Sequence, residues 1–162
     1  MKNFFQIIFL FSLFLLVQTH VWAVSSDVRV TQLTQFLKSY DSPLTPFAAD
    51  FIKYGDKYGV DWKLLPAISG VESTFGKAIP FNSYNAYGWG GGEIVFASWE
   101  ESIGVVTRSL RQNYINRGLT NVDLIGPVYC PPNRSWEINV KYFMQKLETF
   151  SPGQTASLKL SL

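Results

Sequence analysis

The sequence has very few of the residues on which several common kinds of active site depend. It contains one histidine, His20, and one cysteine, Cys130. Because His20 lies in a segment that resembles a removable leader, we expect the mature chain to have no histidine. A Ser-His-Asp triad, a Cys-His pair and a His/Cys zinc site are then excluded. A single cysteine also cannot form an internal disulfide, so stability must come from the core. Catalysis is left to carboxylates, hydroxyl groups and lysine.

The sequence also lacks a large excess of positive or negative charge. The 14 Lys and Arg residues nearly balance the 12 Asp and Glu residues, and no basic cluster is visible. Proteins that bind nucleic acids usually carry a basic patch or stripe, because they must neutralise phosphates. DNA or RNA binding is therefore not expected.

The N-terminus has the pattern of a signal peptide. Lys2 is followed by an apolar stretch over residues 4–17, and Val21-Trp22-Ala23 places a small residue before the expected cleavage point. The pattern predicts a signal peptide over residues 1–23 and a secreted or cell-envelope location. The alternative is an uncleaved membrane anchor, in which the apolar run extends through Val24.

Removal of these 23 of the 162 residues leaves 139, with 13 basic residues because Lys2 is lost. This length fits one domain with a proper core. No repeat or low-complexity linker interrupts it, so we predict one domain over residues 24–150. Residues 151–162 are expected to form a frayed tail.

Apolar residues recur at helical spacing, and no segment alternates as a strand does, which predicts a mainly α fold of five helices. A Ser98-x-x-Glu101 capping box marks one helix start. The expected spans are Asp27 to Tyr40, Thr45-Pro46 to Gly59, Asp61 to Gly76, Ser98 to Gly118, and Asn133 through Leu147. Residues 77–95 are predicted to form an aromatic, glycine-rich loop, and residues 121–132 a connector with a short turn at 122–125.

Glu72 is the best candidate for chemistry. It follows the apolar run Leu64–Val71 and precedes Ser73, so it lies near the C-terminal end of a largely buried helix. Desolvation and the negative end of the helix dipole would both raise its pKa. A carboxyl that stays protonated near neutral pH can act as a general acid. The alternative is an exposed glutamate in the last turn of a helix, where the dipole disfavours an acid.

Four segments, in order, resemble motifs of the lysozyme-like superfamily, which includes goose-type lysozymes, lytic transglycosylases and glucosaminidases. Residues 71–77 resemble the E-S-x-x-G helix end, and residues 85–89 resemble the N-x-F-G loop. Residues 96–103 resemble the F-x-S-x-x-E-a-i helix start. The segment from Tyr129 to Val140 resembles the late Y-a-p, W, V pattern. The resemblance covers residues 60–148.

This resemblance implies a lysozyme-like helical domain in which the glycine- and aromatic-rich loop replaces a large β-lobe. It also implies catalytic roles for Glu72 as general acid and for Tyr129, which would point at Glu72 from the opposite wall. The residues implied to contact the substrate are Ser73, Asn85, Tyr87, Trp89 and Glu93.

The residues alone leave several of these roles open. Tyr84, Tyr87 and Trp89 lie among Gly and Asn, which fits sugar stacking and core filling equally well, and Tyr129 is similarly ambiguous. The other large aromatic residues follow helical spacing and are predicted to fill the core; they include Phe47, Phe51, Trp99, Trp136 and Phe143.

A second carboxylate is harder to assign, although most glycosidases use two. Glu100 and Glu101 fit as first-turn acids, and Asp123 fits as a local cap. Glu93 is either a solvated loop residue or a base. The resemblance to lytic transglycosylases implies that one Glu can suffice, because the 6-hydroxyl of the substrate attacks. Their G-l-m-Q run is absent, however, and residues 88–91 stand in its place.

The expected partner is peptidoglycan or another polymer of N-acetylated amino sugars, cleaved by a monomer without metal or cofactor. The activity implied is that of an endo-β-N-acetylglucosaminidase, a muramidase or a lytic transglycosylase. The missing histidines exclude a zinc amidase. Two alternatives remain: a non-catalytic exported glycan-binding or interaction module on the same fold, and an unrelated helical secreted domain.

Overall fold

The computed structural model describes residues 27–131 and 135–151, and every regular element within these ranges is a helix. The predicted mainly α fold is confirmed at this level. The expected signal peptide over residues 1–23, Asn133 and the tail beyond residue 151 lie outside the described residues. In the described ranges, no helix combines the length and the apolar character needed to cross a membrane.

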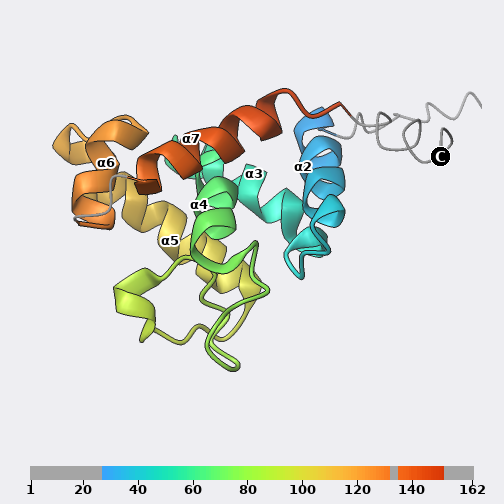
Figure 1. The fold of residues 1–162 in the computed structure, drawn as a ribbon, viewed down its shortest axis with the longest axis horizontal. Coiled ribbons are helices and arrows are strands. Elements are labelled where there is room, and N and C mark those ends of the chain that lie inside the picture. Colours follow the sequence, from blue (N-terminus) through green and yellow to red (C-terminus); the bar gives the residue numbers. More distant parts are fainter. Residues whose placement is uncertain (1–26, 132–134, 152–162) are drawn as a thin grey trace, which may run out of the picture.

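Six α-helices and three short 3₁₀ helices, labelled η, follow one another in the described residues (Figure 1). They are α2 (Val28–Ser39), η1 (Thr45–Phe47), α3 (Ala48–Tyr58), α4 (Leu64–Ser73), η2 (Trp89–Gly92), α5 (Trp99–Asn113), η3 (Ile115–Arg117), α6 (Val122–Tyr129) and α7 (Ser135–Glu148).

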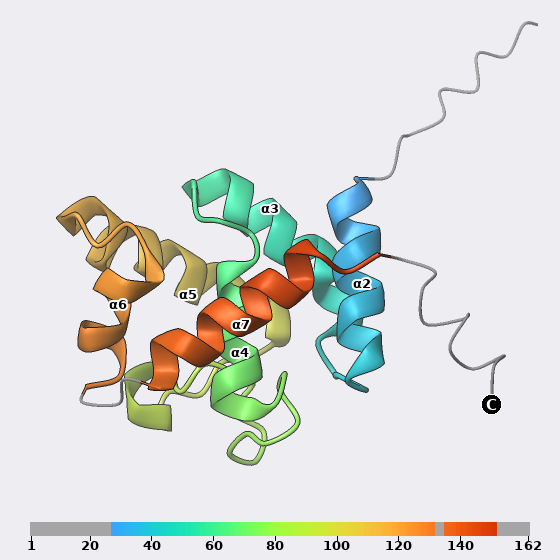
Figure 2. The same cartoon turned by 45° about the horizontal axis from the view of Figure 1, so that its top comes forward.

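Helix α4 lies at the centre of the molecule. It packs against α7 and α5, while α3 packs against both α2 and α5 (Figure 2). Residues 64–69 and Ser73 are all buried. A helix that is apolar on all sides belongs in a core, which explains the continuous apolar run before Glu72. This central position carries the end of α4, with Glu72, towards the irregular segment between α4 and α5.

Two of the predicted helix starts, at Asp27 and Ser98, are confirmed, whereas the helix expected from Asp61 begins at Leu64. Asp27 caps α2 by accepting the backbone N–H of Arg29, and Ser98 Oγ accepts the N–H of Glu101 at 3.0 Å. The return bond of the capping box goes from the N–H of Ala97 to Glu101 Oε2, at 2.6 Å. Each bond satisfies an N–H group that has no partner inside a helix.

Three predicted boundaries are corrected. Thr45 does not cap a helix, because its hydroxyl donates to the carbonyl of Ser42 and Thr45 itself lies inside η1. Helix α4 ends at Ser73, before Gly76, because Thr74 turns into the left-handed region at φ 51°. Helix α5 ends at Asn113, and η3 completes the segment up to Gly118.

The connector prediction for residues 121–132 is also wrong in part, because α6 occupies most of it. Asn121 is the cap: its side chain accepts the N–H of Leu124 at 3.0 Å. Asp123 does not have the expected capping role and bonds Lys141 on α7 at 2.6 Å. Pro127 lies inside α6. Proline is disfavoured inside a helix because it lacks an N–H donor, so the extension of α6 beyond residue 125 is not expected from local sequence.

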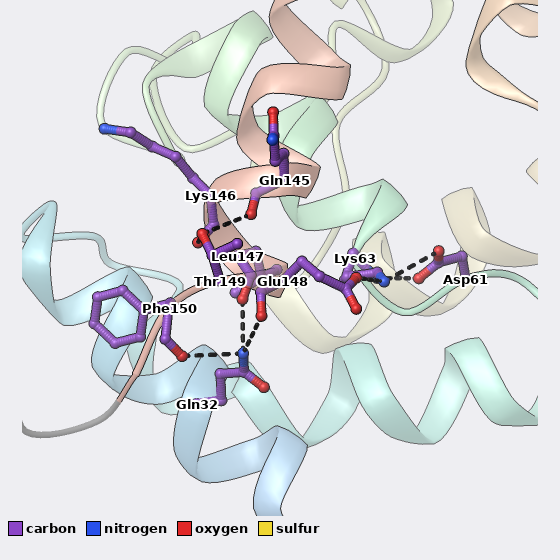
Figure 3. A network of polar contacts seen from close by, with 9 residues as sticks. All are labelled: Gln32, Asp61, Lys63, Gln145, Lys146, Leu147, Glu148, Thr149 and Phe150. Carbon is purple, nitrogen blue, oxygen red and sulfur yellow. Dashed lines mark hydrogen bonds and ion pairs between the residues drawn. The ribbon is translucent and has the colours of Figure 1, made fainter.

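The C-terminal end of α7 is held by polar contacts with distant parts of the chain (Figure 3). The side-chain amide of Gln32 donates to the carbonyls of Leu147 at 2.7 Å and Phe150 at 3.1 Å. Lys63 forms an ion pair with Glu148 and lies 3.7 Å from Asp61. Carbonyls at a helix end have no partner inside the helix, so Gln32 fixes the end of α7 against α2. Lys63 ties the same end of α7 to the start of α4.

Candidate active site

Glu72 is the penultimate residue of α4 and is half-buried. Its Oε1 accepts a hydrogen bond from Trp136 Nε1 on α7 at 2.7 Å. Burial raises the pKa of Glu72 above its usual value, and the bond from Trp136 offsets this only in part. Desolvation penalises the charged form of a carboxyl, whereas a donor to the carboxylate favours that form. The predicted raised pKa is therefore present, with burial as its main cause.

The helix ends immediately after Glu72 in an uncommon backbone conformation. Thr74 and Phe75 have φ values of 51° and 59°, followed by Gly76 at 84°. A β-branched residue such as Thr is seldom found in the left-handed region. Such conformations persist only where the surrounding structure holds them, and they concentrate at functional sites. Here the turn is fixed by Ser73, whose hydroxyl accepts the N–H of Gly76 at 2.9 Å.

Gly88 brings the backbone of the loop next to the other carboxyl oxygen of Glu72. Its φ is 61°, and a Cβ added to Gly88 would lie 2.8 Å from Glu72 Oε2. Real Cβ atoms do not approach a neighbouring group this closely, so any side chain at this position would displace the carboxyl. Glycine is therefore required here for both conformation and space.

An aromatic pocket of about 300 Å³ adjoins this carboxyl through Gly88, although Glu72 itself is not among the residues that line it. It is lined by Gly88, Trp89, Gly90, Gly91, Tyr114 and Tyr129. The ring of Tyr129 lies 5.8 Å from that of Trp89 and 6.0 Å from that of Tyr114. The pocket thus lies between η2, the end of α5 and the end of α6. Exposed aromatic rings in a concave site are suited to a ligand with flat apolar faces.

Trp89 is half-buried and lines the pocket, as the resemblance implied. Tyr114 was not predicted for the site, because it continues the apolar spacing of α5 and reads as a core residue. Trp136 was predicted as core, and its ring is buried at 1 % exposure, but its N–H has the unforeseen role of binding Glu72.

Tyr129 lies in the site but differs from the expectation in its hydrogen bond. Its hydroxyl donates to the backbone carbonyl of Tyr87 at 2.6 Å, instead of pointing at Glu72. Its ring stacks on Trp136 with centroids 4.9 Å apart. Burial, with a smaller contribution from the charge of Glu72, raises the pKa of Tyr129 well above its usual value. Tyr129 is therefore a neutral wall of the site that holds the loop in place.

Three of the residues implied to contact the substrate are corrected to supporting roles, because their side chains are inaccessible. The exposures of Ser73, Asn85 and Tyr87 are 3 %, 2 % and 0 %. The Ser73 hydroxyl donates to the carbonyl of Ala86 at 2.8 Å and so ties the loop to α4. Tyr87 fills the core.

Asn85 organises the glycine-rich turn. Its amide nitrogen donates to the carbonyls of Trp89 at 2.9 Å and Ile94 at 3.0 Å. Its amide oxygen accepts the N–H of Trp89 at 2.9 Å. One buried side chain thus fixes both ends of the turn that forms the pocket.

The remaining carboxylates lie elsewhere or have other partners. Glu93 is exposed at the end of η2. Glu100 and Glu101 occupy the first turn of α5, as predicted, and Glu100 pairs with Lys53 at 2.9 Å. Among residues 27–131 and 135–151, no three His, Cys, Asp or Glu side chains are grouped so that they could hold a metal ion.

Glu137 is a carboxylate that sequence reasoning missed. It packs against Gly126 of α6, and its Oε2 is buried without a hydrogen-bond partner in the described part of the chain. The charges of Glu72 and Glu137 add to burial in raising the pKa of the Cys130 thiol. Both carboxyls therefore lie near Cys130, which is a neutral thiol at neutral pH.

Comparison of the whole chain with protein-family models gives no match, and comparison with curated proteins gives none either.

Proposed function

We propose that this protein is an exported glycosidase of the lysozyme-like type, which cleaves the glycan strand of peptidoglycan or a similar polymer of N-acetylated amino sugars. The observation that carries the proposal is a half-buried glutamate with a raised pKa beside an aromatic pocket. Export rests on the signal-peptide pattern of residues 1–23, and the type of glycosidase rests on the four motifs named above.

In this proposal Glu72 is the general acid. Its proton passes to the glycosidic oxygen while the bond between that oxygen and the anomeric carbon breaks, so the leaving sugar departs as an alcohol. The oxygen of water or of the substrate's own 6-hydroxyl then bonds to the anomeric carbon and loses its proton to the Glu72 carboxylate, which restores the acid. Attack by water gives hydrolysis, and attack by the 6-hydroxyl gives an anhydro sugar. A raised pKa suits this role because the carboxyl must hold its proton until the bond breaks.

The pocket supports sugar binding next to Gly88, the residue that approaches Oε2 of Glu72. Trp89, Tyr114 and Tyr129 offer ring surfaces, while the glycines of η2 leave the backbone open for close approach. The ring contacts among these three residues fix the orientation of the wall before any ligand arrives. A preformed wall lowers the entropy cost of ordering a sugar chain.

The test is mass spectrometry of fragments released from purified peptidoglycan. Fragments with reducing ends indicate a hydrolase, and fragments with anhydro ends indicate a lytic transglycosylase. The identity of the sugar at the new end distinguishes glucosaminidase from muramidase cleavage. Binding to peptidoglycan without any released fragment contradicts the proposal and favours a non-catalytic glycan-binding module.

A further inference from the structure

We propose that Trp136 determines which oxygen of Glu72 carries the acid proton, and that this oxygen is Oε2. The indole Nε1–H donates to Oε1 at 2.7 Å. A protonated carboxyl has one hydroxyl oxygen and one oxygen that only accepts, and indole can only donate. The indole N–H is best satisfied by the accepting oxygen. Oε1 is thereby held as the carbonyl oxygen, and the proton resides on Oε2.

The assigned oxygen is the one beside the loop. The position of a Cβ on Gly88 lies 2.8 Å from Oε2 but 3.4 Å from Cδ of the same carboxyl, so Oε2 is the atom that approaches the loop backbone. Gly88 also lines the aromatic pocket. Trp136 therefore leaves the proton on the oxygen nearest the site where we expect the substrate. This catalytic consequence rests on the proposed function, whereas the placement of the proton does not.

The indole is well fixed for this task. Trp136 is the second residue of α7, its ring is 1 % exposed, and α7 packs along α4. Tyr129 stacks on it with an interplanar angle of 27°, and the hydroxyl of Tyr129 is itself bound to the carbonyl of Tyr87. The indole ring cannot turn without disturbing its stacking on Tyr129 and, through Tyr129, the hydrogen bond to Tyr87. Trp136 is therefore a positioning residue, which acts on the chemistry only through Glu72.

The effect of Glu72 on Trp136 must be distinguished from the effects of other titratable groups near these two residues. Tyr129 and Cys130 lie near Glu72 at the end of α6, and Tyr114 contacts Tyr129 from the end of α5; burial raises the pKa of all three above the usual values. They stay neutral at neutral pH and below. Glu137, the residue after Trp136, is the remaining carboxyl near Cys130. A variant at Glu137 is therefore the matched control for any titration seen at Trp136.

The first test uses NMR and needs no activity. The indole N–H resonance of Trp136 in the ¹⁵N-labelled protein, assigned through Trp136→Phe, is followed as the pH is raised from acid to neutral. We expect it to titrate with a midpoint above that of an ordinary glutamate. The titration should vanish in Glu72→Gln and persist in Glu137→Gln. An indole resonance that does not respond to pH, or that still titrates in Glu72→Gln, overturns the proposal.

The second test uses the pH profile of peptidoglycan cleavage by Trp136→Phe, which keeps an aromatic ring but loses the donor. The Trp136 bond favours the ionised form of Glu72, so its loss raises the pKa of Glu72 further. A general acid fails as it deprotonates, so the alkaline limb of the profile should move to higher pH. We also expect kcat to fall about tenfold or more, the effect of one hydrogen bond to a charged group, with little change in KM.

The matched control is Trp99→Phe, the same chemical change at a half-buried ring that packs on Tyr84 outside the pocket. It should leave the alkaline limb in place. If Trp136→Phe loses activity while the limb does not move, Trp136 is only a packing residue and the proposal fails. If the wild-type protein cleaves no glycan at all, the proposed function fails, and the NMR titration alone decides the role of Trp136.

Discussion

The proposed chemistry depends first on one residue, Glu72, whose environment is neither fully buried nor fully exposed. Glu72 is buried enough to raise its pKa, yet it is open to a loop whose backbone reaches its Oε2. The Trp136 bond opposes the effect of burial without cancelling it. Complete burial would hide the proton from a substrate, and complete exposure would release it below neutral pH. A carboxyl between these limits is suited to donate a proton to a bound ligand.

Single residues differ in how far the sequence reveals them. The position of Glu72 could be predicted, because a charged residue directly after an apolar run must lie at the edge of the core. The role of Trp136 could not be predicted, because helical spacing shows that a ring is buried but not which atom its N–H will meet. Tyr87 and Tyr129 were equally ambiguous in the sequence. In the structure Tyr87 is fully buried, while Tyr129 lines the pocket.

Trp89 provides a test of the pocket at this scale. Its ring is half-buried and contacts Tyr129 and Tyr114 at centroid distances of 5.8 and 6.4 Å. We expect Trp89→Ala to weaken binding of chitin-like oligosaccharides about tenfold, or ~1.4 kcal/mol, because a stacking surface is lost. Isothermal titration calorimetry and thermal melting measure the two effects. Trp99→Ala, at a half-buried ring outside the pocket, should lower the melting temperature without changing affinity. If Trp89→Ala also lowers the melting temperature without changing affinity, Trp89 is a core residue.

Among the elements, the segment between α4 and α5 is irregular but firmly held. Its second half, residues 83–96, is closed by a hydrogen bond from the N–H of Phe96 to the carbonyl of Ser83 at 2.9 Å. Asn85 bridges the turn inside it, and Ser73 ties it to α4. The expected aromatic, glycine-rich loop is present, with η2 as its only regular element in the described structure. Glycines usually indicate mobility, but here buried polar side chains supply the fixed geometry.

Alanine substitutions at two glycines of this loop distinguish the effect of backbone strain from the effect of crowding at Glu72. Gly88 and Gly92 have φ values of 61° and 84°, but an added Cβ meets Glu72 only at Gly88 and has open space at Gly92, which does not line the pocket. Alanine at either position should cost roughly 1–2 kcal/mol for the left-handed backbone. Only Gly88→Ala should also displace the carboxyl and lower glycan cleavage, by about 10²-fold. Urea unfolding and cleavage rates measure both effects. Equal activity losses in the two variants would show that the close approach of Gly88 to Glu72 has no catalytic importance.

Helix α6 shows why element boundaries were harder to predict than element types. Its cap, Asn121, is a normal start signal, but Pro127 within eight residues suggested an early stop. Packing against α7 and the ion pair between Asp123 and Lys141 stabilise a helix that local sequence disfavours. The position of α6 matters for the site, because Tyr129 is its last residue.

At the scale of the whole molecule, the mechanism depends on whether a second carboxylate takes part. An inverting glycosidase holds its two carboxyls roughly 6.5–9.5 Å apart, and a retaining one about 5–5.5 Å apart. Glu93 is exposed at the end of η2, outside the lining of the pocket, and Glu100 and Asp123 are engaged in ion pairs. Glu137 packs against Gly126 with its Oε2 buried, and it does not line the pocket either. This distribution favours cleavage with a single acid, in which water or the substrate's own hydroxyl attacks.

The corresponding variant is Glu93→Gln, which removes the charge but keeps the size of the side chain. We expect it to retain most of the wild-type rate of fragment release from peptidoglycan, because the Glu93 side chain is exposed and is not among those that line the pocket. Circular dichroism and melting curves serve as controls for folding. A complete loss of turnover in a normally folded Glu93→Gln protein would identify Glu93 as the base and refute the single-acid account.

The most direct measurement of the central claim is the rate at which Glu72→Gln releases soluble fragments from purified peptidoglycan, relative to the wild-type protein. The amide oxygen of Gln can still accept the N–H of Trp136, so circular dichroism and melting should show a folded protein. The amide has no acidic proton to give, so the rate should fall at least about 10²-fold. A folded Glu72→Gln protein that cleaves peptidoglycan at close to the wild-type rate would contradict the account.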